Sequence, residues 1–276
     1  MIEFIDVSFS YDKKGTTVLN NLTFKIEKGE FVAVVGKNGA GKTTLLKHIN
    51  GLLRPTIGQV KIEDEDIVKK PLSEMAMTVG LAFQNPDHQL FAETVLKELE
   101  FGPKNLGSDP EKIEEKIQEI AEHFRITHLL ERNPLELSGG ERRLVSIASV
   151  LTMNQSILVL DEPTFGQDYR QKKRLGNFLK SLSEKGITII VVSHDLNFIL
   201  DFAQRIIVVS NGEVIKDEST FDVLSDETLL EKSDLAQPVL LNLATNLRKR
   251  FDDFPLSYNS EEFVENLKQI LQKGEK

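Results

Sequence analysis

The segment FVAVVGKNGAGKTT (residues 31–44) places a glycine-rich loop directly after a short apolar strand. The strand is apolar on both of its faces, which is typical of a central strand in a sheet that is covered on both sides. The loop matches the pattern G-x-x-x-x-G-K-[ST], which turns backbone N–H groups towards phosphate oxygens. A glycine-rich turn that binds nothing is the alternative, but the strand before the loop and the helical pattern after it favour a phosphate-binding loop.

Each residue type in this loop has a physical role in holding a nucleoside triphosphate. Gly36, Gly39 and Gly41 let the backbone turn sharply and approach the phosphates. Lys42 would reach the β- and γ-phosphates, and the Thr43 hydroxyl would bind Mg²⁺. The helix that follows points the positive end of its dipole, equivalent to about half a charge, at the same anion.

Polar side chains follow two further apolar strands. ILVLDEPT (157–164) ends its strand in Asp161 and Glu162, and VVSHD places His194 after another strand. Beside a phosphate loop, Asp161 could hold Mg²⁺ through water, and Glu162 could act as the general base that polarises an attacking water. Taken alone, such a carboxylate pair is more often a solvated strand end, and a lone histidine is usually structural. Because several strand ends carry polar groups, we expect them to converge on one ligand.

The segment LSGGERRLVSIASVL (137–151) predicts a second helix whose N-terminus can bind an anion. A plain helix cap would need only Ser138. The adjacent Gly139 and Gly140 indicate close approach by another group, and a phosphate is the natural candidate.

In this order, the motifs make residues 1–215 resemble the ATP-binding cassette (ABC) ATPases. GKNGAGKT resembles the Walker A loop, LSGGE the signature and ILVLDE the Walker B strand. Gln84 is similar to the Q-loop glutamine, residues 165–168 to the D-loop and His194 to the H-loop histidine. Tyr11 is similar to the aromatic residue that stacks on adenine, and Val18 would pack nearby.

The resemblance implies two cassettes that face each other head to tail, with ATP and Mg²⁺ between them. The ATP-binding residues would be Tyr11, Val18, Gly36, Asn38, Gly39, Gly41, Lys42, Thr43 and Thr44, with Ser138 and Gly140 acting from the second cassette. Mg²⁺ would be bound by Thr43, Gln84 and Asp161, and the catalytic residues would be Lys42, Gln84, Glu162 and His194. Asp168 would lie at the seam between the cassettes.

Three residues depart from the family pattern. Glu141 replaces the usual signature glutamine, Leu144 stands where arginine is common, and Gln167 replaces the usual D-loop leucine. The phosphate-contacting groups are intact. These changes could alter helix packing or the dimer seam, so asymmetry between two ATP sites stays open.

The pattern of apolar residues predicts an α/β fold. We expect an ABC-type P-loop ATPase domain over 1–215, with a mixed sheet core, an antiparallel β subdomain and a helical subdomain at about 85–150. Asn211-Gly212 predicts a hairpin turn near the end of this domain. A small α-rich C-terminal domain, expected to support dimerisation, would cover 216–276.

The segment FQNPDHQLFAETVLKELEFGP (83–103) resembles the ATPase subunits of energy-coupling factor (ECF) transporters, which import vitamins and transition-metal ions. The resemblance implies a short helix starting near Asp87, at the groove that receives arginine-bearing coupling helices of the transmembrane T-component. Asp87 and Glu93 would be the acidic partners, because an Arg–carboxylate pair is directional. A polar loop capped by Asp87 is the alternative. Residues 234–257 resemble the small domain that holds two ATPase subunits together in this family.

The composition fits such a subunit. A net charge of −9 argues against a nucleic-acid binder, and the absence of cysteine excludes disulfides and thiolate metal sites. The apolar runs fall far short of the roughly 20 residues that span a bilayer, and no signal peptide is visible. We therefore expect a soluble subunit held at the cytoplasmic face of the cell membrane by its partners, with a separate S-component that selects the substrate.

Three alternatives remain: the ATPase of a conventional ABC importer, a soluble ABC protein of translation or DNA repair, and a regulatory cassette that binds ATP without hydrolysing it. A single cassette without long insertions disfavours the second, and intact Glu162 and His194 disfavour the third. The sequence names neither the transported substrate nor whether the partner cassette is an identical or a related chain.

Overall fold

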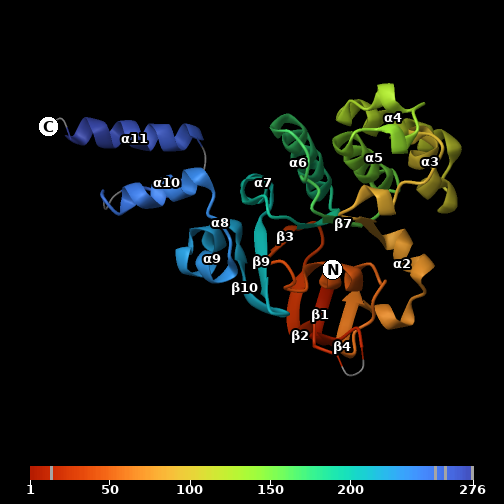
Figure 1. Cartoon of the computed structure of the whole chain (residues 1–276), viewed down its shortest axis with the longest axis horizontal. Helices are drawn as coiled ribbons and strands as arrows, with labels where there is room; N and C mark the ends of the chain where they lie inside the picture. Colours follow the sequence, from red (N-terminus) through yellow and green to blue (C-terminus); the bar gives the residue numbers. More distant parts are fainter. Residues whose placement is uncertain (13–14, 252–253, 258–259, 275–276) are drawn as a thin grey trace.

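Two sheets form the frame of the chain in the computed structural model, which describes residues 1–12, 15–251, 254–257 and 260–274 (Figure 1). The larger sheet has the order β10-β9-β3-β8-β7-β6, in which β10 is antiparallel to β9 and the other pairs are parallel. Its strands are β3 (Phe31–Val35), β6 (Val79–Ala82), β7 (Ile157–Asp161), β8 (Thr188–Val192), β9 (Arg205–Ser210) and β10 (Glu213–Ser219). The smaller, antiparallel sheet has the order β2-β1-β4-β5 and comprises β1 (Ile2–Phe9), β2 (Leu19–Ile26), β4 (Ile57–Ile62) and β5 (Glu65–Asp66).

Helices surround the larger sheet. Those before residue 215 are α1 (Lys42–Ile49), α2 (Leu72–Thr78), α3 (Val95–Asn105), α4 (Pro110–Phe124), α5 (Gly139–Leu151), α6 (Tyr169–Glu184) and α7 (Leu196–Phe202). Those that follow it are α8 (Thr220–Ser225), α9 (Glu227–Ser233), α10 (Val239–Arg248) and α11 (Ser260–Gly274).

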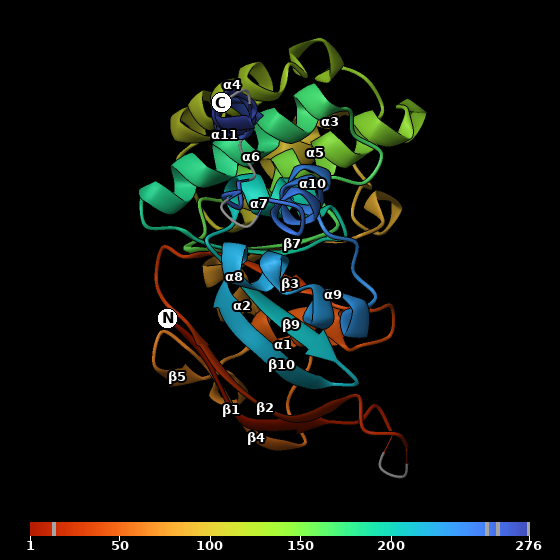
Figure 2. The same cartoon turned by 90° about the vertical axis from the view of Figure 1, so that its left-hand side faces the viewer.

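The central strands separate two hydrophobic cores. Every residue of β3, β7 and β8 is buried, as the apolar runs predict. Along β3, Phe31, Ala33 and Val35 pack in the core that contains α5, α6 and α7. Val32 and Val34 pack in the other core, with α1 and the antiparallel sheet. Figure 2 shows this layering, with helices above the larger sheet and the antiparallel sheet below it. The predicted α/β fold with a mixed sheet and an antiparallel subdomain is confirmed.

The helical layer is made by α3, α4 and α5, whose first turns are capped by side chains. Thr94, Asp109 and Ser138 each accept a hydrogen bond from a backbone N–H in the first turn of the following helix. The buried faces of these helices belong to the same core as one face of the sheet. The orientation of α5, which starts at the second glycine-rich segment, is therefore tied to the sheet by packing.

Between β6 and α3, the short helix predicted near Asp87 is present as a single 3₁₀ turn at Pro86–His88, and no further helix forms in the described residues before α3. The reason is a competing contact: the Glu98 carboxylate accepts hydrogen bonds from the backbone N–H groups of Phe91 and Ala92, each at 2.9 Å. These bonds hold the stretch before α3 in a non-helical conformation.

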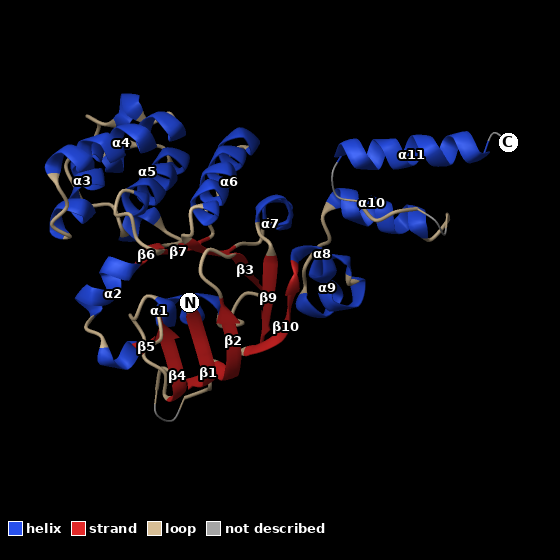
Figure 3. Ribbon diagram, turned by 180° about the vertical axis from the view of Figure 1, so that it is seen from behind, coloured by secondary structure: helices blue, strands red, loops and turns tan. Residues whose placement is uncertain are grey.

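The C-terminal helices α10 and α11 extend from the side of β9 and β10, away from α3 and α4 (Figure 3). They share a small core of their own, which contains Ala244, Phe254 and Phe263. The predicted hairpin turn at Asn211–Gly212 is confirmed, with both residues at positive φ between β9 and β10. The domain division at residue 215 and the dimerisation role of 216–276 remain predictions. None of the helices in the described ranges has the length and apolar character needed to cross a bilayer.

Candidate functional site

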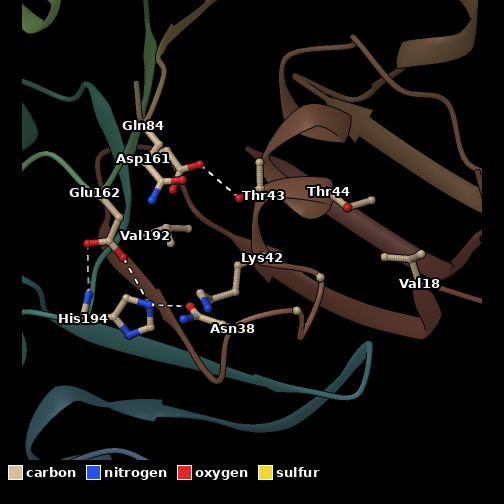
Figure 4. Close-up of a pocket in the computed structure, with 12 residues that line it drawn as sticks. Val18, Asn38, Lys42, Thr43, Thr44, Gln84, Asp161, Glu162, Val192 and His194 are labelled. Carbon is tan, nitrogen blue, oxygen red and sulfur yellow. Dashed lines mark hydrogen bonds and ion pairs between the residues drawn. The ribbon is translucent and has the colours of Figure 1, made fainter. Parts of the chain in front are cut away.

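A cavity of about 340 Å³ lies at the carboxyl ends of the parallel strands, where the sequence predicts the ATP site (Figure 4). Its lining residues are Val18, Asn38, Gly39, Gly41, Lys42, Thr43, Thr44, Gln84, Asp161, Glu162, Val192 and His194. The cavity thus gathers the predicted residues of four separate motifs. It is not lined by the predicted residues Tyr11, Gly36, Ser138 and Gly140, nor by Asp87, Glu93 and Asp168.

The phosphate loop is held in shape by contacts within the chain. Gly36 has φ 147°, and a Cβ at this position would lie 2.0 Å from the carbonyl oxygen of Val209, so only glycine fits. The buried Lys42 ammonium donates hydrogen bonds to the carbonyl oxygens of Gly36 at 2.7 Å and Lys37 at 2.9 Å. Burial lowers the pKa of Lys42, and the nearby Glu162 and Asp161 carboxylates oppose that shift. The ammonium is therefore fixed at the cavity wall.

Asp161 and Thr43 bring oxygen ligands together across the cavity. The Thr43 hydroxyl donates to Asp161 Oδ2 at 3.1 Å, although the two residues lie on different motifs. Burial raises the pKa of Asp161, whereas the Thr43 hydrogen bond and the Arg143 charge lower it. Gln84 lines the same cavity, and Figure 4 shows it beside Asp161. A hydroxyl, a carboxylate and an amide oxygen form a donor set that suits Mg²⁺, which prefers oxygen ligands.

Glu162 has the environment expected of a general base. Its backbone adopts φ 50°, in the left-handed region that non-glycine residues rarely occupy, and its N–H donates to the Val192 carbonyl oxygen at 2.8 Å. Carboxylate Oε2 accepts from the His194 backbone N–H at 3.3 Å and from the Ser193 hydroxyl at 3.4 Å. Oε1 is buried and accepts no hydrogen bond from the described residues. Burial raises the pKa of Glu162, which brings its proton affinity closer to what base catalysis near neutral pH requires.

His194 reaches across the cavity to the phosphate loop. Its Nε2 lies 3.1 Å from Asn38 Oδ1 and 3.5 Å from Glu162 Oε1 (Figure 4). The imidazole therefore stands between the β8 end and the loop, where it can donate one hydrogen bond to an oxygen of a ligand.

Tyr11 lies outside the cavity lining but contacts a lining residue. Its hydroxyl is 3.0 Å from Thr44 Oγ1, its ring packs edge-on against Phe9, and 57% of its surface is exposed. An exposed ring tethered at the first turn of α1 is accessible to a flat ligand.

The second glycine-rich segment (138–140) and the segment similar to the D-loop (165–168) lie outside the cavity. Ser138 and Glu141 form a reciprocal cap in which the Ser138 hydroxyl donates to Glu141 Oε2 at 2.6 Å. A Cβ on Gly139 would meet nothing within 4 Å, so this chain alone does not require glycine there. Asp168 caps α6 by accepting from Gln171 N at 2.8 Å. Gln167 is buried, and neither polar atom of its side chain has a hydrogen-bond partner among the described residues.

The two predicted acidic docking residues already have partners within the chain. Asp87 lies 3.3 Å from Arg142 of α5, and Glu93 lies 2.5 Å from Lys97 of α3. Both carboxylates are at the surface, with side-chain exposures of 51% and 83%. Any external arginine would therefore have to compete with an existing ion pair.

An apolar groove of about 420 Å³ runs beside this acidic region. Among its lining residues, Leu52, Leu72, Phe91 and Phe101 are exposed, and the rings of Phe91 and Phe101 meet edge to face with centroids 4.7 Å apart. The apolar lining of this groove could not be predicted from the sequence, because its residues come from segments that lie far apart in the chain.

Two further residues of the site were not predicted. Val192 lines the cavity at the end of β8, and Ser193 donates to Glu162. Their position directly before His194 was the available signal, since residues at the end of a buried strand share the edge of the sheet.

Three comparisons place this geometry among known proteins. Residues 19–165 match the family model described as ABC transporter. The chain is 40% identical to the energy-coupling factor transporter ATP-binding protein EcfA of Methanothermobacter thermautotrophicus, over 98% of this chain and 88% of that protein. It is 39% identical to the protein of the same name from Methanocaldococcus jannaschii, over 94% and 92%.

Solved structures of ABC transporter subunits are similar to this chain in fold. The structure of cbiO1 from Clostridium perfringens, described as part of the ABC transporter complex cbiONQ, has a TM-score of 0.74 at 28% identity and covers 90% of this chain and 98% of that one. A dimeric ATP-binding cassette in a post-hydrolysis state, bound to ADP and Pi, has a TM-score of 0.73 at 28% identity and covers 80% and 99%.

Proposed function

Since this chain belongs to the ABC transporter family, within the group of energy-coupling factor transporter ATP-binding proteins, we propose that its cavity hydrolyses ATP together with a second cassette and drives a transmembrane partner. The observation that carries this proposal is the convergence of Lys42, Thr43, Asp161, Glu162 and His194 on one cavity.

The chain's own residues supply the chemistry of hydrolysis. Lys42 and the loop N–H groups hold the phosphates. Glu162 takes a proton from the attacking water at Oε1, which accepts no hydrogen bond from the described residues and lies 3.5 Å from His194 Nε2. His194 donates to a γ-phosphate oxygen from its position beside Asn38. When bound, Mg²⁺ would neutralise charge on the phosphates, and Thr43, Gln84 and Asp161 would hold it.

The adenine end of the site is supplied by Tyr11 and Val18. Tyr11 is exposed and Val18 lines the cavity, so the adenine of an ATP whose phosphates lie at the phosphate loop would contact these two side chains. The contact from the Tyr11 hydroxyl to Thr44 keeps the ring close to this path. Stacking on an aromatic face suits a purine without requiring a specific hydrogen bond.

A second cassette completes the site. The two residues predicted to act from the second cassette, Ser138 and Gly140, lie outside the cavity. Ser138 is exposed and Gly140 is half-buried, so both are placed to meet a phosphate held by another chain. Asp168 and the exposed Phe165 belong to the same surface segment, which fits a dimer seam. On α10, Val239 and Leu243 lie one turn apart and are exposed, which provides an apolar surface for contact between subunits.

The groove beside the Q-loop is the proposed docking site for the transmembrane T-component. Acidic residues were predicted to have this role, and the exposed side chains of Phe91 and Phe101 provide apolar walls beside them. An incoming arginine could displace Arg142 from Asp87, which would connect docking to helix α5. A separate S-component would select the vitamin or metal ion, and these partners would hold the chain at the cytoplasmic face of the membrane.

Reversing charge tests the acidic residues. Asp87→Lys or Glu93→Lys is expected to lower co-purification with the transmembrane component by about tenfold, because an arginine on the partner would then meet a like charge. ATP binding should stay intact, since neither residue lines the cavity. If co-purification survives both reversals, the acidic assignment is wrong.

Phe91→Glu then tests the groove by itself. This change is expected to lower recovery of the transmembrane component by at least about tenfold, because it places a charge in an apolar contact. Ile57→Glu is the matched control, since Ile57 is equally exposed but lies on β4 and does not line the groove. Equal recovery from both variants would exclude the groove as the docking site.

Affinity purification of the tagged chain from its native membrane tests the proposed function as a whole. We expect a second ABC subunit, a polytopic membrane protein and a small substrate-binding membrane protein to co-elute, and mass spectrometry would identify them. Recovery of ribosomes or DNA instead would favour a soluble ABC protein and contradict the proposal.

A further inference from the structure

One buried arginine in α5 does not line the cavity and has no assigned contact with ATP or Mg²⁺. Arg143 is 2% exposed, and none of the carboxylates in the described ranges lies within ion-pair distance of it. Burial of a guanidinium is costly unless its N–H groups are satisfied. Desolvation lowers the pKa of Arg143 to about 10, with the charges of Asp161 and Glu162 opposing the shift. The side chain therefore remains charged at neutral pH. Its Nη1 and Nη2 groups are hydrogen-bonded, whereas Nε has no hydrogen-bond partner among the described residues.

The Arg143 guanidinium binds backbone on two different segments. Nη1 donates to the carbonyl oxygens of Phe83 and Gln84, with the second bond at 3.0 Å. Nη2 donates to the carbonyl oxygen of Asp161. One side chain on α5 thus joins the segment that leaves β6 to the end of β7.

These bonds begin where the sheet ends. Strands β6 and β7 pair in parallel up to Ala82 and Leu160, and the next position in this register would set Phe83 beside Asp161. That pair makes no ladder contact, and both carbonyl oxygens bind Arg143 instead. The hydrogen bonds of the guanidinium thus replace the strand pairing at the position where the chain leads to Gln84 and Asp161 in the cavity.

The shape of the side chain suits this contact. Arginine presents its N–H groups in a rigid planar fork, so a single residue can fix the separation of two backbone segments. Lysine has one flexible ammonium and would not set both contacts in a fixed geometry.

We propose that Arg143 is a positioning residue for hydrolysis, which holds the backbone of Gln84 against that of Asp161 and so sets the spacing of the two side chains assigned to Mg²⁺. Because Arg143 lies five residues after Ser138 on α5, it also connects the surface that meets the second cassette to the metal side of the cavity. This inference rests on the proposed function.

The test compares ATP binding with and without Mg²⁺ in the Glu162→Gln background, where turnover does not interfere. Arg143→Lys is expected to leave affinity for ATP in EDTA unchanged and to reduce the Mg²⁺-dependent increase in affinity by about tenfold or more. In the hydrolysing chain, Arg143→Lys should lower kcat by about 10- to 100-fold with little change in the KM for ATP. Arg143→Gln, which keeps a planar donor without the charge, should show the same loss.

Leu151→Ala is the matched control, because Leu151 is buried on the same helix but lies eight residues, about two turns, after Arg143 at the other end of α5. It should lower the unfolding temperature while leaving the Mg²⁺ effect intact. An unchanged Mg²⁺ effect in Arg143→Lys, or an equal loss in Leu151→Ala, would overturn the role of Arg143. A wild-type chain that binds no ATP would instead contradict the proposed function itself.

Discussion

Replacing Glu162 with Gln is expected to reduce the turnover of ATP by roughly 10²- to 10⁴-fold, the range that a positioned general base contributes. The amide keeps the size of the side chain but cannot accept a proton from water. ATP binding should be retained, because the groups proposed to hold the phosphates lie on the loop before α1 and at Lys42, the first residue of α1. Phosphate release and equilibrium binding of ATP, measured on the same preparation, separate the two effects.

The environment of Glu162 also predicts a pH dependence. Burial raises its pKa, and the deprotonated form is the active base, so turnover should fall with decreasing pH at a higher pH than for an ordinary glutamate. This acid limb should be missing from the residual activity of Glu162→Gln. Near-normal turnover in the variant, or an unchanged acid limb, would remove Glu162 from its assigned role.

The raised pKa of Glu162 also predicts that Glu162→Gln stabilises the folded chain. A carboxyl whose pKa is higher in the folded chain than in the unfolded chain loses its stabilising contribution as the pH rises through the folded value. At neutral or alkaline pH the ionised side chain therefore disfavours folding, and Glu162→Gln should raise the unfolding temperature of the isolated chain. This distinguishes loss of the base from loss of the fold.

Replacing Lys42 with Ala is expected to weaken ATP binding by about 10- to 100-fold, since hydrogen bonds to charged groups contribute roughly 1.5–3 kcal/mol each. The loss has two sources. The β- and γ-phosphates lose their cation, and the carbonyl oxygens of Gly36 and Lys37 lose the ammonium that holds the loop. Titration of ATP into the purified chain measures the change.

Lys47→Ala is the control for this variant, because Lys47 lies on the same helix but does not line the cavity. It should bind ATP nearly as well as the wild type. Equal affinity of Lys42→Ala and Lys47→Ala would mean that the phosphates do not bind at this loop.

The lining of the cavity could be predicted because each motif follows a strand. The residues after β3, β6, β7 and β8 all lie at the carboxyl edge of one parallel sheet, so convergence of Lys42, Gln84, Asp161 and His194 follows from topology. The fold class could be predicted for a similar reason, since apolar runs and alternation distinguish covered strands from half-covered ones.

Contacts that depend on the three-dimensional surroundings of a side chain could not be predicted. Asp87 and Glu93 looked free in the sequence, yet Arg142 and Lys97 pair with them. The bonds of Arg143 escape prediction because their acceptors are backbone carbonyls, which no residue type reveals. Ser138 is exposed and does not line the cavity, so its predicted contact with ATP requires a second cassette. The sequence of one cassette does not show how that second cassette is placed.

The central claim is that ATP is hydrolysed only when two cassettes close on it. The most direct test is the rate of phosphate release per chain from Mg²⁺-ATP, measured over about a hundredfold range of protein concentration, because association follows mass action. The claim predicts that the rate per wild-type chain rises with concentration towards a plateau. It also predicts that the rate per chain of Ser138→Arg stays near zero at every concentration. A constant, substantial rate per chain that Ser138→Arg leaves unchanged would contradict it.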